Sequence, residues 1–152
     1  MKDLVVIGGP NGAGKTTAAY DLLPQSLPIR QFVNADEIAR GLSPFDPEGS
    51  AVAAGRLMLH RMRSLVELGE NFAFETTCAS RGHPRLLRTA RELGYRVTLL
   101  FLWLPSPEAA VERVSHRVRQ GGHRIPAAVV HRKYWVGLRN MYNFICRLRI
   151  SR

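Results

Sequence analysis

A glycine-rich loop near the start of the chain restricts its possible folds more than any other feature. The residues Gly9-Pro-Asn-Gly-Ala-Gly-Lys-Thr-Thr17 follow four apolar residues and precede a helix-forming run. Within them, Gly9, Gly14, Lys15 and Thr16 fit the pattern G-x-x-x-x-G-K-[ST] of a Walker A loop. Glycines let backbone N–H groups approach a phosphate chain, and the helix that follows directs its positive dipole end at the anion. The sequence therefore predicts a nucleotide-binding loop between a strand and a helix.

The residues of this loop have distinct expected roles. Lys15 should reach the β- and γ-phosphates, and the Thr16 hydroxyl should hold Mg²⁺. We predict that the nucleotide-binding residues are Gly9, Pro10, Asn11, Gly12, Ala13, Gly14, Lys15, Thr16 and Thr17.

Length and composition predict one α/β domain over residues 1–152, large enough for a three-layer core. No apolar run approaches the roughly 20 residues of a membrane span. We therefore expect neither a membrane segment nor a signal peptide. The two cysteines, Cys78 and Cys146, fit no metal-binding spacing. Such cysteine usage indicates a reduced, cytoplasmic compartment.

The positive charge is concentrated toward the end of the chain. The net charge is +10, yet residues 1–112 balance 12 basic against 12 acidic residues, whereas residues 113–152 carry 10 basic residues and no acid. Such a segment is typical of a nucleic-acid surface, of a kinase segment that folds over triphosphate, or of a solvated basic face. The arginine spacing favours the second interpretation, so we expect nucleic acid to be an unlikely partner.

The chain alternates apolar, β-branched runs with helical patterns, which predicts a P-loop NTPase sandwich with a mainly parallel central sheet. We expect residues 36–41 to form a single turn or loop, and the run 97–104 to form a strand buried on both faces. We expect Pro24 to stop the first helix, and Asp46, Ser80 and Ser106 to cap later helices. The last helix should begin at Pro126 and run on, without a final strand. The strand over residues 97–104 would then be an exposed sheet edge.

Two acidic residues follow predicted strands, at the sheet edge where ligands bind in parallel α/β proteins. Asp36 comes directly after the second strand, so its carboxylate should lie near the γ-phosphate and accept a proton from an attacking hydroxyl. Glu75 ends the third strand and is followed by Thr76. This acid can orient Mg²⁺ through water or bind substrate hydroxyls. We therefore predict Asp36, Glu75 and Thr76 as substrate-binding residues, with Asp36 also catalytic.

The basic segment over about residues 113–132 resembles a lid over the phosphates. Arg113 and Arg117 are four residues apart and share a helix face, and Gly121-Gly122 offers a hinge. Planar guanidinium groups stabilise the charge that spreads during phosphoryl transfer. We predict Arg117 and Arg119 as catalytic residues, and His123 and Arg132 as substrate-binding residues.

Five motifs in this order resemble the zeta toxin family. They are Gly9 to Thr17, Phe32-Val-Asn-Ala-Asp-Glu-Ile-Ala39, Glu75-Thr-Thr77, Phe101-Leu-Trp-Leu-Pro-Ser-Pro107 and Arg117-Val-Arg-Gln-Gly-Gly-His123. That family consists of phosphate-loop kinases, whose best-known members phosphorylate a UDP-activated amino sugar. The resemblance implies ATP and Mg²⁺ bound by Lys15 and Thr16, Asp36 as general base, Glu75 at the substrate, and arginines of 113–132 on phosphate. It also implies a small-molecule acceptor and an inhibitory protein partner, an antitoxin.

Two other classes of function fit parts of the sequence. An ATP-hydrolysing switch or transport ATPase would use the same loop. It also needs an apolar strand that ends in Asp-Glu and a Leu-Ser-Gly-Gly-Gln type signature, and the sequence contains neither. A nucleic-acid-binding module or polynucleotide-end kinase would use the basic segment, and its affinity would depend steeply on salt.

Overall fold

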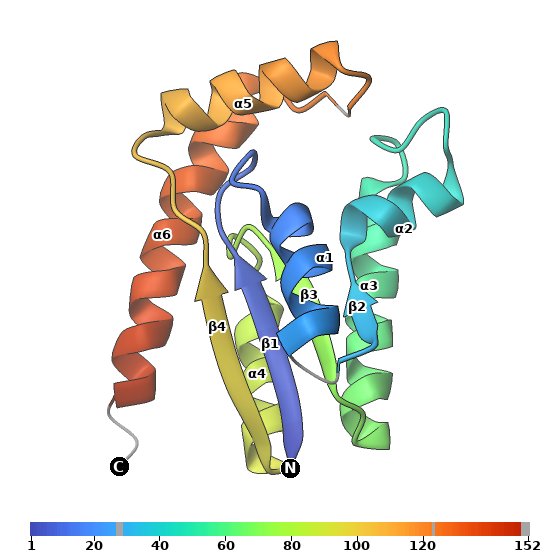
Figure 1. Cartoon of the computed structure of the whole chain (residues 1–152), viewed down its shortest axis with the longest axis vertical. Coiled ribbons are helices and arrows are strands. Elements are labelled where there is room, and N and C mark those ends of the chain that lie inside the picture. The colour runs from blue at the N-terminus through green and yellow to red at the C-terminus, as the bar shows by residue number, and fades with distance from the viewer. Residues whose placement is uncertain (27–28, 123, 150–152) are drawn as a thin grey trace.

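The computed structural model describes residues 1–26, 29–122 and 124–149, which form a parallel four-stranded sheet flanked by helices (Figure 1). The strands lie in the order β2-β3-β1-β4. They are β1 (Lys2–Gly8), β2 (Gln31–Val33), β3 (Phe72–Thr76) and β4 (Tyr95–Phe101). The helices are α1 (Lys15–Ser26), α2 (Ala35–Leu42), α3 (Ala51–Leu68), α4 (His83–Glu92), α5 (Pro107–Arg119) and α6 (Ala127–Arg149). The fold confirms the predicted α/β P-loop NTPase class.

The central strand β1 supplies apolar side chains to both faces of the sheet. Leu4 and Val6 face α3 and α4, where they join a core with Met58, Met62, Phe72 and Phe74. Val5 and Ile7 face α1 on the opposite side, with Ala19, Leu23 and Ile29. Burying one such large side chain contributes about 1.5–3 kcal/mol. Packing on both faces of the sheet therefore fixes the position of the carboxyl end of β1, where the glycine-rich loop begins.

The strand register explains why polar residues from separate segments meet at one edge of the sheet. Gly8, the last residue of β1, pairs with Thr76 of β3, and Val33 of β2 pairs with Phe74. Because the pairing is parallel, Asn34 follows its strand beside Glu75, and both face the loop that follows β1. The phosphate-binding loop and the ends of β2 and β3 therefore converge.

Several predicted element boundaries are wrong, because local contacts override single-residue signals. Pro24 lies inside α1, which continues to Ser26. The segment predicted as a turn after β2 is the two-turn helix α2, because Asn34 caps its first N–H groups. The cap predicted at Asp46 belongs instead to a turn, where its Oδ1 accepts from the N–H of Gly49 at 3.0 Å.

Of the caps predicted at Ser80 and Ser106, the first is wrong and the second is confirmed. Helix α4 begins after Gly82, and Ser80 accepts a hydrogen bond from the Gly82 N–H instead of capping the helix. Helix α5 begins after Ser106, whose Oγ accepts from the N–H of Ala109 at 3.1 Å, as predicted. Gly69 ends α3 in a left-handed conformation, with φ of 73°, which glycine adopts without strain.

The strand β4 lies at the edge of the sheet, so the predicted burial on both faces is wrong. Its residues alternate between exposed and more buried positions, and it ends at Phe101 instead of Leu104. Edge placement agrees with the expectation that α6 runs on, which it does to Arg149. Residues 150–152, at the end of the chain, lie outside its described part. No helix in the described ranges is long and apolar enough to cross a membrane.

Candidate active site

The loop between β1 and α1 is wrapped tightly by its surroundings. The N–H of Gly9 donates to the carbonyl of Thr76 at 3.2 Å, which ties the loop to the end of β3. A Cβ on Gly9 would lie 2.3 Å from the carbonyl oxygen of Leu102, and one on Gly12 would lie 2.9 Å from the Cβ of Arg113. Both glycines also have positive φ. Larger residues would push α5 and the segment that follows β4 away from the loop, so these positions require glycine.

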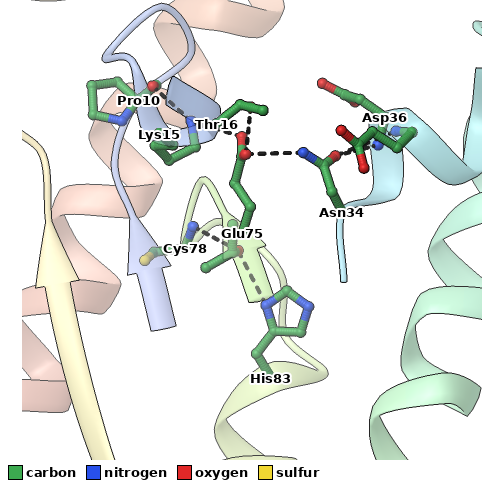
Figure 2. Close-up of polar contacts among 10 residues, drawn as sticks. Pro10, Lys15, Thr16, Asn34, Asp36, Glu75, Cys78 and His83 are labelled. Atoms are coloured by element: carbon green, nitrogen blue, oxygen red, sulfur yellow. Dashed lines mark hydrogen bonds and ion pairs between the residues drawn. The ribbon is translucent and has the colours of Figure 1, made fainter. Parts of the chain in front are cut away.

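Lys15 is buried at the base of the loop, where it holds the loop's own backbone. Its Nζ donates to the carbonyl of Pro10 at 2.9 Å and lies 3.7 Å from Oε1 of Glu75 (Figure 2). Burial lowers the pKa of Lys15, while the carboxylates of Glu75 and Asp36 oppose that change. The ammonium group therefore lies beside the Glu75 carboxylate and within the electrostatic influence of Asp36.

Glu75 connects three segments of the site (Figure 2). Its Oε2 accepts a hydrogen bond from the Thr16 hydroxyl at 2.6 Å and another from Nδ2 of Asn34 at 2.9 Å. The same carboxylate faces Lys15. Glu75 thus joins the start of α1 to the end of β2, and its charge is matched by donors on all sides.

Asn34 is a site residue that the sequence reasoning missed. While Nδ2 binds Glu75, Oδ1 accepts from the N–H groups of Asp36 at 2.8 Å and Glu37 at 3.4 Å. Asn34 therefore caps α2 and fixes where Asp36 begins that helix. An Asn just before a short acidic stretch is an N-cap signal, and it could have revealed both the helix and this role.

One cavity of about 350 Å³ brings five of the predicted site residues together. Asn11, Lys15, Asp36, Glu75 and Thr76 all line it. Thr16 lies outside the lining but contacts Glu75. Three charged or polar residues that the sequence did not single out also line it, namely Arg56 of α3, His83 of α4 and Lys133 of α6. They come from separate helices, and no local motif marks them.

The predicted lid residues are only partly brought to this site. Arg117 is half-buried, and its charge is the smallest of the named influences on the pKa of Lys15, which it lowers. Arg119 and Arg132 are exposed and do not line the cavity. His123 lies outside the described residues. Arg113, which the sequence placed on the lid helix, approaches the Gly12 carbonyl at 3.5 Å.

Two orphaned polar atoms near the loop mark places where a ligand can supply a partner. Oδ1 of Asn11 and Nε of Arg117 are buried, and neither has a hydrogen-bond partner among the described residues. Buried polar atoms are ordinarily paired. A Cβ on Gly122 would lie 2.7 Å from Cγ of Arg117, so the second glycine of the pair allows the chain to pass close to this arginine.

The donor set fits a nucleotide-borne magnesium ion better than a metal held by protein alone. Within the described ranges, no group of three or more His, Cys, Asp or Glu residues could hold a metal. The Thr16 hydroxyl and the Glu75 carboxylate nevertheless offer two adjacent hard oxygens, 2.6 Å apart. Mg²⁺ binds through one or two such oxygens together with phosphates and water. These residues therefore fit Mg²⁺ that arrives with a nucleotide.

The fold and the loop define the class of protein as a P-loop NTPase. The family model described as "AAA domain" matches residues 4–133, so the chain belongs to that family. A curated relative from Haemophilus influenzae, described as an uncharacterized protein, is 27% identical over 126 residues, covering 83% of this chain and 88% of the relative.

Solved structures show the same fold at low sequence identity. The AvrRxo1-ORF1:AvrRxo1-ORF2 structure with sulphate ions matches 99% of this chain at 18% identity with a TM-score of 0.77, and a second structure of that pair contains ATP. The PezAT toxin-antitoxin system of Streptococcus pneumoniae matches 78% at 20% identity with a TM-score of 0.62. A gluconokinase from Sinorhizobium meliloti matches 89% at 19% identity with a TM-score of 0.52. The chain spans about half of the AvrRxo1 and PezAT chains, 52% of each, and 74% of the gluconokinase.

Proposed function

We propose that the protein is an ATP-dependent kinase that transfers the γ-phosphoryl group to a hydroxyl of a small acceptor. The observation that carries this proposal is the single cavity that Lys15, Asp36 and Glu75 line together. A nucleotide loop that only switches conformation does not need a free carboxylate beside the transferred group. Similar folds in a gluconokinase and in a protein solved with ATP support a phosphotransferase that uses ATP.

In the proposed reaction, the acceptor oxygen forms a bond to the γ-phosphorus as the bond from phosphorus to the β,γ-bridging oxygen breaks. ADP leaves with that bridging oxygen, and the acceptor proton passes to the Asp36 carboxylate. Asp36 suits this role because its side chain is exposed to the cavity at the first turn of α2. Lys15 neutralises charge on the β- and γ-phosphates, and Arg117 adds charge stabilisation from α5.

Mg²⁺ supplies charge neutralisation on the phosphates when it is bound. Thr16 and Glu75 are the residues that we propose to hold it. Asn34 keeps the Glu75 carboxylate turned toward Thr16 and away from Asp36, so the two acids perform separate tasks.

We further propose that the enzyme is a zeta-toxin-like kinase. Its five sequence motifs and its structural likeness to the PezAT system support this, although the family model that matches is the AAA domain. A UDP-activated amino sugar is the acceptor that this kinship suggests, and a protein antitoxin is the partner. ATP chemistry and the sequence composition agree with a cytoplasmic location.

The test is to incubate the protein with γ-labelled ATP, Mg²⁺ and a panel of sugar acids, sugar phosphates, nucleotide sugars, nucleosides and RNA ends. We expect label to pass to a small molecule and not to RNA. Lys15→Ala is the control, because it removes the charge on the β- and γ-phosphates and should reduce transfer by several orders of magnitude. Equal transfer by this variant, or label released only as free phosphate, would contradict the kinase assignment.

A further inference from the structure

The cavity that contains Asp36 also contains cations that the phosphate-binding loop does not use. Arg56 and Lys133 line it together with Lys15. Lys15 is occupied by Pro10 and Glu75, and the Glu75 carboxylate is occupied by Lys15, Thr16 and Asn34. In the described part of the chain, the Arg56 and Lys133 side chains have neither an ion pair nor a hydrogen bond. The cavity therefore has two positive charges to offer a ligand.

Lys133 is held in place by tight packing of α6 against the end of β3. Gly137 lies one helical turn after Lys133, and a Cβ there would be 2.2 Å from the Thr77 carbonyl oxygen. One turn further on, Nδ2 of Asn140 donates to the Cys78 carbonyl at 2.8 Å. Residues 133, 137 and 140 share one helix face. That face places Lys133 over the Thr77 segment, which lines the same cavity.

Arg56 comes from α3, which lies on the β2 side of the sheet, whereas α6 lies on the β4 side (Figure 1). The neighbouring residues of the α3 face that line the cavity are Val52, Gly55 and Leu59. Gly55 is a helix-interior glycine, and nothing lies within 4 Å of the position its Cβ would take. A glycine there weakens the helix but leaves room in front of Arg56.

The remaining titratable groups of the cavity do not cancel these charges. His83 is half-buried, with its Nδ1 3.1 Å from the Thr76 hydroxyl oxygen, and desolvation lowers its pKa to about 4, so it is neutral at pH 7. Asp36 and Glu75 are the acids of the lining. Glu75 is matched by Lys15, which leaves Asp36 as the one other acid of the lining beside Arg56 and Lys133, so the lining has a surplus of positive charge.

We infer that the phosphate acceptor is a hydroxyl compound carrying an anionic group, and that Arg56 and Lys133 bind this group while the hydroxyl lies at Asp36. The inference rests on the proposed kinase function and narrows its substrate class. A carboxylate and a phosphoryl group both satisfy this chemistry, because each pairs with Arg and Lys.

The experiment measures binding with the loop occupied by a non-hydrolysable ATP analogue and Mg²⁺, so that added anions cannot enter the γ-phosphate position. Glycerol, D-glycerate and glycerol 3-phosphate are titrated calorimetrically, because they share a polyol frame and differ in charge. We expect at least one anion to bind about tenfold or more tightly than glycerol, as a charge-assisted contact is worth roughly 1.5–3 kcal/mol. The preferred anion identifies the group as carboxylate or phosphoryl.

Variants test whether the two cations cause this preference. Arg56→Gln and Lys133→Gln should each reduce anion binding by roughly 10-fold or more and leave glycerol binding unchanged. The charge-conserving Arg56→Lys and Lys133→Arg should retain most of it. Arg63→Gln on α3 and Arg139→Gln on α6 are matched controls, because both residues are exposed and neither lines this cavity.

Three results would overturn the inference. They are a wild-type protein without anion preference, a preference that survives in the double Gln variant, and a double variant that loses the ATP analogue as strongly as the anion. The last would assign both cations to the nucleotide. Failure of the kinase function is distinguishable, since anions would then bind as expected while no acceptor acquires label from ATP.

Discussion

The two sides of the cavity are built in different ways. On the nucleotide side, one continuous stretch from Gly9 to Thr17 supplies the backbone and side chains, and Lys15 and Thr16 already have polar partners in the protein. On the acceptor side, single residues come from α2, α3, α4 and α6, and Arg56, Lys133 and Asp36 face open space. In the proposed function, phosphate binding is thus a local property of the chain, whereas the choice of acceptor depends on tertiary packing. One fold can therefore keep the same phosphate-binding loop while its acceptor-binding residues vary.

The largest effect expected on the acceptor side is that of Asp36→Asn. Asn keeps the shape of Asp but is a far poorer base, so transfer should fall by about 10²–10⁴. ATP binding and the fold should persist, because Asn34 caps α2 through backbone N–H groups that this change retains. Single-turnover transfer and ATP-analogue binding are the measurements.

Glu37→Gln is the matched control for this variant. Glu37 is also exposed in the first turn of α2, but its carboxylate accepts from the Tyr20 hydroxyl and it does not line the cavity. We expect a mild effect. Full activity of Asp36→Asn together with loss of activity in Glu37→Gln would mean that the two acids have exchanged roles. The nucleotide side would then extend further along α2 than the geometry indicates.

The acceptor side should also respond to acid through His83. Its folded-state pKa is lowered to about 4 by burial, compared with 6.5 for the exposed side chain. At pH values between about 4 and 6.5, His83 is mostly protonated in the unfolded chain and mostly neutral in the folded protein. The stability contribution is therefore complete above pH 6.5 and is lost as pH falls toward 4, by up to about 3 kcal/mol.

Urea unfolding of the wild type and of His83→Gln between pH 7.5 and 4.5 measures this effect. Other acids titrate equally in both proteins, so the difference between their free energies of unfolding isolates His83. That difference should shift in favour of the variant as pH falls. If the free energies of unfolding of the two proteins changed in parallel with pH, His83 would be hydrated in the folded protein. The part of the cavity around His83 would then be open to solvent.

The sequence correctly placed the loop of the nucleotide side between a strand and a helix, because the signal for it is local. Few other folds place glycine, lysine and threonine at this fixed spacing after a strand and before a helix. The parallel sheet, the last helix and the cap at Ser106 were also predicted, since each depends on periodicity or on neighbouring residues. Asp36, Glu75 and Thr76 were placed on the cavity by the rule that ligands lie beyond strand ends.

The sequence did not reveal the other residues of the acceptor side, because tertiary contacts, and not local signals, bring them to the cavity. Lys133 reaches the cavity because Gly137 lets α6 pack on the Thr77 carbonyl, a contact that only the fold creates. The sequence reasoning chose the adjacent Arg132, which α6 turns toward solvent. Asn34 was passed over because its two roles, capping α2 and binding Glu75, join segments 41 residues apart.

The arginines of α5 test how far the nucleotide side extends. Arg117 lies close enough to affect the pKa of Lys15, whereas Arg119 is exposed. Arg117→Ala should slow transfer by roughly 10–100-fold, as expected for one charge-assisted hydrogen bond, with a smaller loss of ATP affinity. Arg119→Ala should remain near the wild-type rate. Equal losses in both variants would instead support a general electrostatic effect of the basic segment.

The smallest expected effect is that of Gly55→Ala, which probes the open space on the acceptor side. Ala is favoured over Gly in a helix interior by roughly 0.5–1 kcal/mol, and the new methyl group would meet no atom within 4 Å. Thermal unfolding should therefore show a small stabilisation with unchanged ATP binding. Gly55→Leu should project further into the cavity and weaken acceptor binding while retaining the helical gain. Stabilisation without loss of acceptor binding in the Leu variant would mean that the acceptor does not occupy the space in front of Arg56.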